Sequence, residues 1–206
     1  MKTLVIINGH PDPRPERFCA ALAQAYKDGA EEGGWQTTRV DIGALPAASL
    51  AALCHGHCED NKLRSQINEI ANADRLVLVY PLWCERPPQG LLDLFAYLEE
   101  VQWSPTGGRK AQLIVTMDMP AFAYRRMVAP ETIEKPQMLD IPGIFPDEPV
   151  LIGCVPAISA EQRGRWLAAM HDYGKRTNCG AAIVPSRMEA FAAAVDRKVS
   201  EWWAAL

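Results

Sequence analysis

Two arginines lie in a short loop that follows the first apolar segment of the chain. Arg14 and Arg17 belong to residues 9–19, GHPDPRPERFC, which lead directly into an expected helix. Guanidinium groups and the free backbone N–H groups of a helix N-terminus both bind anions. The pattern therefore favours a bound phosphate group. It is also typical of a proline-stiffened turn whose arginines face solvent.

Four soft metal ligands occur within five positions of the chain: Cys54, His55, His57 and Cys58 in the segment CHGHC. Cys54 and Cys58 share one side if the segment forms a helical turn. However, so short a run can hardly supply all four ligands of one tetrahedral site, and structural zinc sites use separated pairs of ligands. We therefore expect a polar loop here and no bound metal.

The length, composition and net charge of the chain exclude several classes of protein. The chain has 206 residues, of which 49% are hydrophobic and 22% charged, and this is typical of one soluble globular domain with a full core. The net charge of −4 argues against a nucleic-acid partner. No apolar run reaches the ~18–20 residues of a membrane-spanning helix, and no signal-peptide core follows Met1. We expect a cytoplasmic protein with free cysteines, no membrane insertion and a single domain over residues 1–206.

Short apolar runs alternate along the chain with segments of helical hydrophobic spacing. The runs predict five strands, over residues 3–8, 36–42, 75–80, 110–117 and 149–154. The helical spacing predicts helices over residues 16–32, 61–72, 88–101, 159–179 and 185–206. This alternation is typical of an α/β fold in which a doubly wound, five-stranded parallel sheet carries helices on both faces.

Two segments stand apart from this alternation. Residues 118–149 contain six prolines and only short helical stretches, and such a long connection predicts a lid-like insertion. Residues 185–206 have apolar side chains at helical spacing, so this last amphipathic helix is expected to bury one face against its own sheet or a second subunit.

Ligands of doubly wound sheets bind beyond the carboxyl ends of the strands, so residues 10–19, 81–86 and 117–124 are the candidate site segments. No G-x-G-x-x-G turn follows the first strand. Its absence argues against a dinucleotide-type Rossmann site and favours a flavodoxin-like strand order.

These segments carry the motifs GHPD and RFC within residues 9–19, YPLW at residues 80–83, and TM, MPA and YR between residues 116 and 125. Together the motifs resemble the NAD(P)H:quinone oxidoreductase family of flavodoxin-like fold, from Met1 to about Gly174. The resemblance implies an enzyme that holds FMN or FAD. It would transfer hydride from NADH or NADPH to a quinone or similar small acceptor by a ping-pong mechanism, as a homodimer.

The resemblance also assigns roles to individual residues. Trp83 and Tyr124 would shape the catalytic pocket around the flavin and the acceptor. The cofactor-binding residues that it implies are His10, Arg17, Phe18, Cys19, Pro81, Leu82, Trp83, Cys84, Thr116, Met117 and Asp118. Cys19 and Cys84 are expected to be unreactive buried thiols, because nothing near them in the sequence lowers a thiol pKa.

The sequence departs from the family pattern at two places. Residues 84–90 read CERPPQG, where Glu85 and Arg86 add charge to an apolar surface and Pro87 lacks a backbone donor. Asp118 stands where relatives tend to carry glycine, and its carboxylate would oppose an anionic reduced flavin. These departures leave an alternative open. The protein would then be a flavodoxin-like chain with weakened or lost flavin binding, acting as a regulatory partner subunit or on an unusual substrate.

Overall fold

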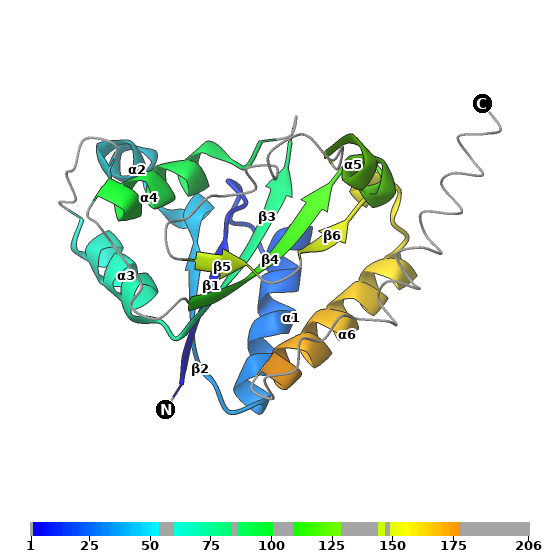
Figure 1. Ribbon diagram of the computed structural model, residues 1–206, viewed down its shortest axis with the longest axis horizontal. Helices are drawn as coiled ribbons and strands as arrows, with labels where there is room; N and C mark the ends of the chain where they lie inside the picture. The colour runs from blue at the N-terminus through cyan, green and yellow to red at the C-terminus, as the bar shows by residue number, and fades with distance from the viewer. Residues whose placement is uncertain are drawn as a thin grey trace.

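The computed structural model describes residues 2–53, 60–83, 86–100, 109–128, 144–146 and 149–177. They form one parallel sheet with the strand order β2-β1-β3-β4-β5, in which β6 also pairs with β4 (Figure 1). This order confirms the predicted flavodoxin-like doubly wound sheet. The strands are β1 (Thr3–Asn8), β2 (Gln36–Asp41), β3 (Arg75–Leu82), β4 (Arg109–Met117), β5 (Ile144–Pro146) and β6 (Val150–Ile152).

The three central strands, β1, β3 and β4, are rich in apolar residues because helices cover both of their faces. Every residue of β1 after Thr3 and every residue of β3 after Arg75 is buried. Neighbouring side chains of a strand point to opposite faces, so Leu4 and Ile6 join one core cluster while Val5 and Ile7 join the other.

Helices form a layer on each side of the sheet (Figure 1). The cluster that contains Leu4 is closed by α1 and α6, and the cluster that contains Val5 is closed by α2, α3, α4 and α5. The helices are α1 (Phe18–Glu32), α2 (Ala47–Leu53), α3 (Asn61–Asn72), α4 (Gln89–Glu100), α5 (Ala121–Val128) and α6 (Ala160–Arg176), with 3-10 turns η1 (Ile42–Ala44) and η2 (Val155–Ala157).

Two short strands share one edge of β4. β5 pairs with its first residues, beginning at Arg109↔Ile144, and β6 pairs with its last ones, beginning at Ile114↔Val150. The segment predicted as a lid-like insertion therefore supplies an edge strand, β5, and also α5, which lies where β4 ends (Figure 1).

Several predicted boundaries shift in the structure. α1 begins at Phe18, two residues later than predicted, and β3 continues to Leu82. Residue 42 opens η1 instead of ending β2, and α2 was not predicted at all. The predictions for residues 54–58, Cys84 and 185–206 lie outside the described residues.

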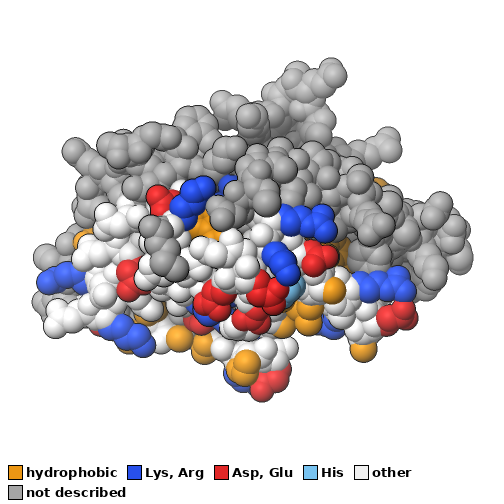
Figure 2. Space-filling view, turned by 90° about the horizontal axis from the view of Figure 1, so that it is seen from below, with side chains coloured by type: hydrophobic (Ala, Val, Ile, Leu, Met, Phe, Trp, Pro, Cys, Tyr) orange, Lys and Arg blue, Asp and Glu red, His pale blue; other side chains and the backbone are white. Residues whose placement is uncertain are grey.

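The face of the molecule at which the strands begin carries charges of both signs. Figure 2 shows Lys and Arg side chains lying among Asp and Glu side chains there, with hydrophobic side chains in small separate groups. Among the helices of the described ranges, none combines the length and the apolar character that crossing a membrane requires.

Candidate functional site

The carboxyl ends of β1, β3 and β4 lie next to one another in the sheet. β1 is placed between β2 and β3, so the chain leaves β1 towards one side of the sheet and later returns on its other side. Such a switch point opens a crevice beyond the strand ends, and in sheets of this order it holds the ligand. The residues that follow β1 and β3 therefore define the candidate site.

Two aromatic rings meet at this switch point. The His10 ring, directly after β1, contacts the Trp83 ring, directly after β3, with centroids 5.5 Å apart and planes at 80°. Trp83 is held by two backbone hydrogen bonds with Arg86, one of 3.1 Å and one of 2.9 Å. Its side chain is nevertheless 44% exposed. The structure thus brings two of the predicted segments together around an accessible indole.

Asn8 fixes the start of the loop that carries His10, and sequence reasoning missed it. Its fully buried side chain donates from Nδ2 to Asp41 Oδ1 at 2.7 Å, and its Oδ1 accepts from the His10 N–H at 3.2 Å. Asn8 and Asp41 are register partners in β1 and β2. The polar residue that ends β1 is the one signal in the sequence that could have identified this role.

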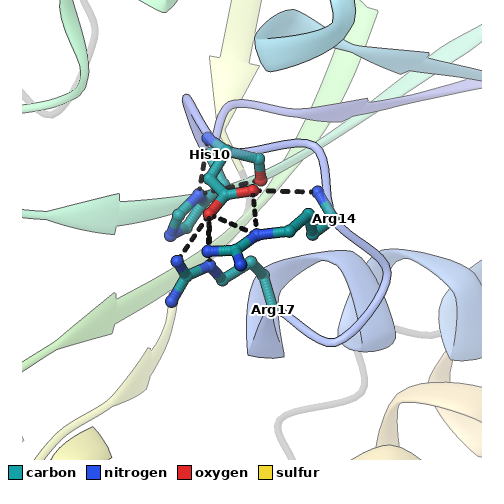
Figure 3. Close-up of polar contacts among 4 residues, drawn as sticks. His10, Arg14 and Arg17 are labelled. Carbon is teal, nitrogen blue, oxygen red and sulfur yellow. Dashed lines mark hydrogen bonds and ion pairs between the residues drawn. The ribbon is translucent and has the colours of Figure 1, made fainter.

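The loop between β1 and α1 is organised around one carboxylate. Asp12 accepts ion-pair hydrogen bonds from both Arg14 and Arg17, as Figure 3 shows. These two guanidinium groups hold the pKa of Asp12 far below its usual range, Arg14 having the larger effect. Within the protein itself, the anion beside the two arginines is therefore the Asp12 carboxylate, and a bound phosphate there stays a prediction.

The first turn of α1 keeps backbone donors for a further anion. Arg17 is the N-cap residue, and its side chain makes no capping hydrogen bond. The first N–H groups of a helix have no partner within the helix, and they carry its positive dipole end. The following residue, Phe18, is buried under the Arg163 guanidinium of α6, which lies 4.8 Å from the ring centroid. Arg163 was not predicted as a site residue.

Cys19 links the start of α1 to the end of β4. Its Sγ lies 3.3 Å from Thr116 Oγ1, and both side chains are buried. Burial raises the pKa of the Cys19 thiol to about 11, so it stays protonated at neutral pH. A protonated thiol is a poor nucleophile, so the structure agrees with the expectation that Cys19 is unreactive.

The remaining predicted residues fall into a buried and an exposed set. Arg17, Trp83 and Asp118 are exposed. Buried side chains can support a ligand from beneath but present little surface to it. The buried members are Phe18, Cys19, Pro81, Leu82, Thr116, Met117 and Tyr124.

The residues after Trp83 that depart from the family pattern differ in their burial. Arg86 is exposed, whereas Pro87 and Pro88 are buried and lead directly into α4. No group of three or more metal-ligating side chains occurs among the described residues, a set that does not include residues 54–58.

We expect His10→Gln to reduce the acid sensitivity of the fold. Burial lowers the pKa of His10 below its usual value of 6.5. The unfolded chain then binds a proton that the folded protein excludes, so stability is present above about pH 6.5 and is lost as the pH falls below it. Urea unfolding between about pH 7.5 and 5 should show that the free energy of unfolding falls less steeply for His10→Gln than for wild type. Equal slopes of unfolding free energy against pH in the two proteins would contradict the assignment of this acid sensitivity to His10.

Comparison with known proteins gives one family match. A family model described as flavodoxin-like fold matches residues 1–172. No curated protein matches the sequence. Solved structures do, among them an NAD(P)H:quinone oxidoreductase from Methanothermobacter marburgensis. It is 16% identical, covers 86% of this chain and 97% of its own, and has a TM-score of 0.61.

Two further structures show the same likeness. An FMN-dependent NADH-azoreductase from Bacillus anthracis, solved in complex with FMN, is 13% identical over 85% of this chain and 99% of its own, with a TM-score of 0.57. An oxidoreductase from Corynebacterium diphtheriae is 14% identical over 85% of this chain and 95% of its own, with a TM-score of 0.60. At such low identities the likeness concerns the fold.

Proposed function

The chain belongs to the flavodoxin-like fold family, and from that premise we propose that it is a flavin-dependent oxidoreductase. It takes hydride from NADH or NADPH and passes it to a quinone or similar small acceptor. The observation that carries this proposal is the contact of the His10 and Trp83 rings, 5.5 Å apart, at the switch point between β1 and β3. A flat, partly apolar ligand fits an exposed indole placed there.

FMN is the cofactor that the surrounding residues fit. Its phosphate would bind Arg17 and the backbone N–H groups that open α1, where no side chain caps the helix. Its ring system would contact Trp83 and His10. The FMN-dependent azoreductase with a similar fold supports the choice of FMN. Bound FMN supplies the hydride chemistry, and the protein has to orient it and set its electrostatic surroundings.

The chain's own residues then have distinct tasks. Burial keeps His10 neutral at pH 7, so the ring adds no charge beside the cofactor. Buried Thr116 and Met117 exclude water from the end of β4. Asp118 is exposed, so solvent and salt weaken its repulsion of a reduced flavin. The departure at Asp118 is therefore compatible with flavin binding.

We place the acceptor on the exposed side of Trp83. Tyr124 of α5 is buried in the core cluster that contains Val5, so it would support the pocket from within. Alternating binding of nicotinamide and acceptor at one surface gives the ping-pong mechanism. A homodimer is also part of the proposal, with residues 185–206 as the segment that would contact the second subunit.

Steady-state kinetics of the FMN-loaded protein test the proposed reaction. We expect parallel double-reciprocal lines when NADH or NADPH is varied at several fixed concentrations of a simple benzoquinone. Omitting FMN from the assay is the control for free-flavin chemistry, together with FMN without protein. Intersecting lines would contradict the ping-pong mechanism. Bound FMN that no nicotinamide reduces would favour the regulatory or repurposed alternative.

A further inference from the structure

The carboxylate at the centre of the loop between β1 and α1 leads to an inference about cofactor affinity, which rests on the proposed function. We infer that Asp12 is an internal counter-anion: it occupies the guanidinium groups that would bind the cofactor phosphate, and so weakens binding of phosphate-bearing ligands. Asp12 is thus a specificity-determining residue of the proposed site. Removing its charge should strengthen phosphate binding.

The Asp12 carboxylate lies within hydrogen-bond distance of both guanidinium groups. Arg14 Nε lies 3.0 Å and 2.9 Å from the two carboxylate oxygens, and Arg14 Nη2 lies 2.6 Å from Oδ2. Arg17 donates to the same Oδ2 from Nε at 2.7 Å, and its Nη2 lies 2.5 Å from that oxygen. One carboxylate therefore holds both guanidinium groups together, as Figure 3 shows.

The charge of this cluster limits its attraction for a phosphate. Two guanidinium groups and one carboxylate sum to one positive charge, whereas a flavin phosphate carries nearly two negative charges at neutral pH. Asp12 stays ionised well below neutral pH because Arg14 and Arg17 favour its charged form. Its repulsion of an approaching phosphate is therefore constant across the physiological pH range.

The arginines nevertheless remain open to a second anion. The side chains of Arg14 and Arg17 are 64% and 44% exposed, while that of Asp12 is 25% exposed. Each guanidinium has five N–H donors, and Asp12 engages only Nε and one Nη of each. A phosphate can therefore reach the remaining donors of Arg17 without displacing Asp12, but it binds in the field of the carboxylate.

The variant Asp12→Asn removes the charge of this residue and keeps its hydrogen bonds within the loop. Asp12 Oδ1 accepts from the Arg14 N–H at 3.1 Å, and the Asp12 N–H donates to His10 Nδ1 at 3.0 Å. Asp12→Asn keeps the backbone donor and a carbonyl oxygen at Oδ1, so the loop retains both hydrogen bonds. Asp12→Ser is a second uncharged variant with a hydroxyl acceptor, for use if the first variant folds poorly.

Inorganic phosphate is the first probe, because it tests the inference without a flavin. We expect Asp12→Asn to bind phosphate about tenfold more tightly than wild type, as one unit of opposing charge is removed at close range. The readouts are the rise in Tm with phosphate concentration and isothermal titration calorimetry. Glu32→Gln is the matched control: Glu32 ends α1 and accepts from Lys175 at 3.0 Å and His171 at 3.1 Å. It should bind phosphate like wild type.

FMN and riboflavin then separate this inference from the proposed function. We expect Asp12→Asn to bind FMN more tightly with unchanged riboflavin affinity, since riboflavin lacks the phosphate. Unchanged or weaker phosphate and FMN binding in both Asp12 variants would overturn the inference and make Asp12 a positioning residue. Tighter phosphate binding in a protein that binds no flavin would support the counter-anion role and overturn the proposed cofactor.

Discussion

Arg17→Ala should lower the affinity for FMN by roughly 10- to 100-fold while changing riboflavin affinity less than about twofold. Hydrogen bonds to a charged group contribute about 1.5–3 kcal/mol each, and 1.4 kcal/mol corresponds to a factor of ten. Arg17 is the N-cap residue of α1, and its guanidinium group is part of the proposed phosphate site. Fluorescence titration with both flavins measures the two affinities in parallel.

Arg165→Ala is the matched control for this variant. Arg165 is also an exposed arginine in an ion pair, with Glu161 at 2.5 Å, but both partners of this pair belong to α6. We expect wild-type affinity for both flavins. Equal weakening of FMN and riboflavin by Arg17→Ala would show that the residue supports the loop and does not bind phosphate.

Gly43→Ala should destabilise the fold by about 1–3 kcal/mol and weaken FMN binding with it. An ideal Cβ at Gly43 would lie 2.3 Å from the Pro11 carbonyl oxygen and 2.7 Å from that of His10. Both contacts are to backbone, which cannot turn away as a flexible side chain can. The loop that carries His10 must therefore move away from η1, and its contact with Trp83 weakens.

Gly164→Ala provides the comparison for this glycine variant. Apart from the neighbouring backbone of α6 itself, no atom of the described residues lies within 4 Å of a Cβ at Gly164, and the residue lies inside α6. Alanine is favoured over glycine in a helix, so stability should rise by up to about 1 kcal/mol with unchanged FMN affinity. Urea unfolding measures both variants. Equal stability of Gly43→Ala and wild type would contradict the close packing of η1 under the loop.

The central strands could be predicted because their sequence and their environment agree. β1 and β3 are almost continuous apolar runs and β4 is rich in apolar residues, as strands covered on both faces require. α3 has its predicted bounds, Asn61–Asn72, and the structure shows Asp60 capping it and its buried residues recurring at helical spacing. Local signals of this kind do not depend on distant parts of the chain.

The elements that sequence reasoning missed lack such local signals. β5 has three residues, too few for a periodic pattern, and it forms because β4 offers an unpaired edge. α2 and α5 have seven and eight residues, and their helical character depends on packing against the sheet. These elements are determined by tertiary contacts.

The candidate site also has one part that local sequence predicts and another that depends on tertiary contacts. The three site segments followed from the rule that ligands bind beyond the carboxyl ends of strands. The role of Asn8 did not, because its partner Asp41 is 33 residues away and the pairing depends on strand order and register. The engagement of Asp12 by Arg14 and Arg17 also escaped prediction, since sequence spacing alone does not show which way an arginine turns.

The visible absorption spectrum of the purified protein tests the central claim most directly. The protein is incubated with excess FMN, passed through gel filtration, and then mixed anaerobically with NADH or NADPH. The account predicts flavin bands that persist after filtration at about one FMN per chain, bleach with a nicotinamide and return when quinone is added. A colourless protein that binds no FMN at micromolar concentration would contradict it.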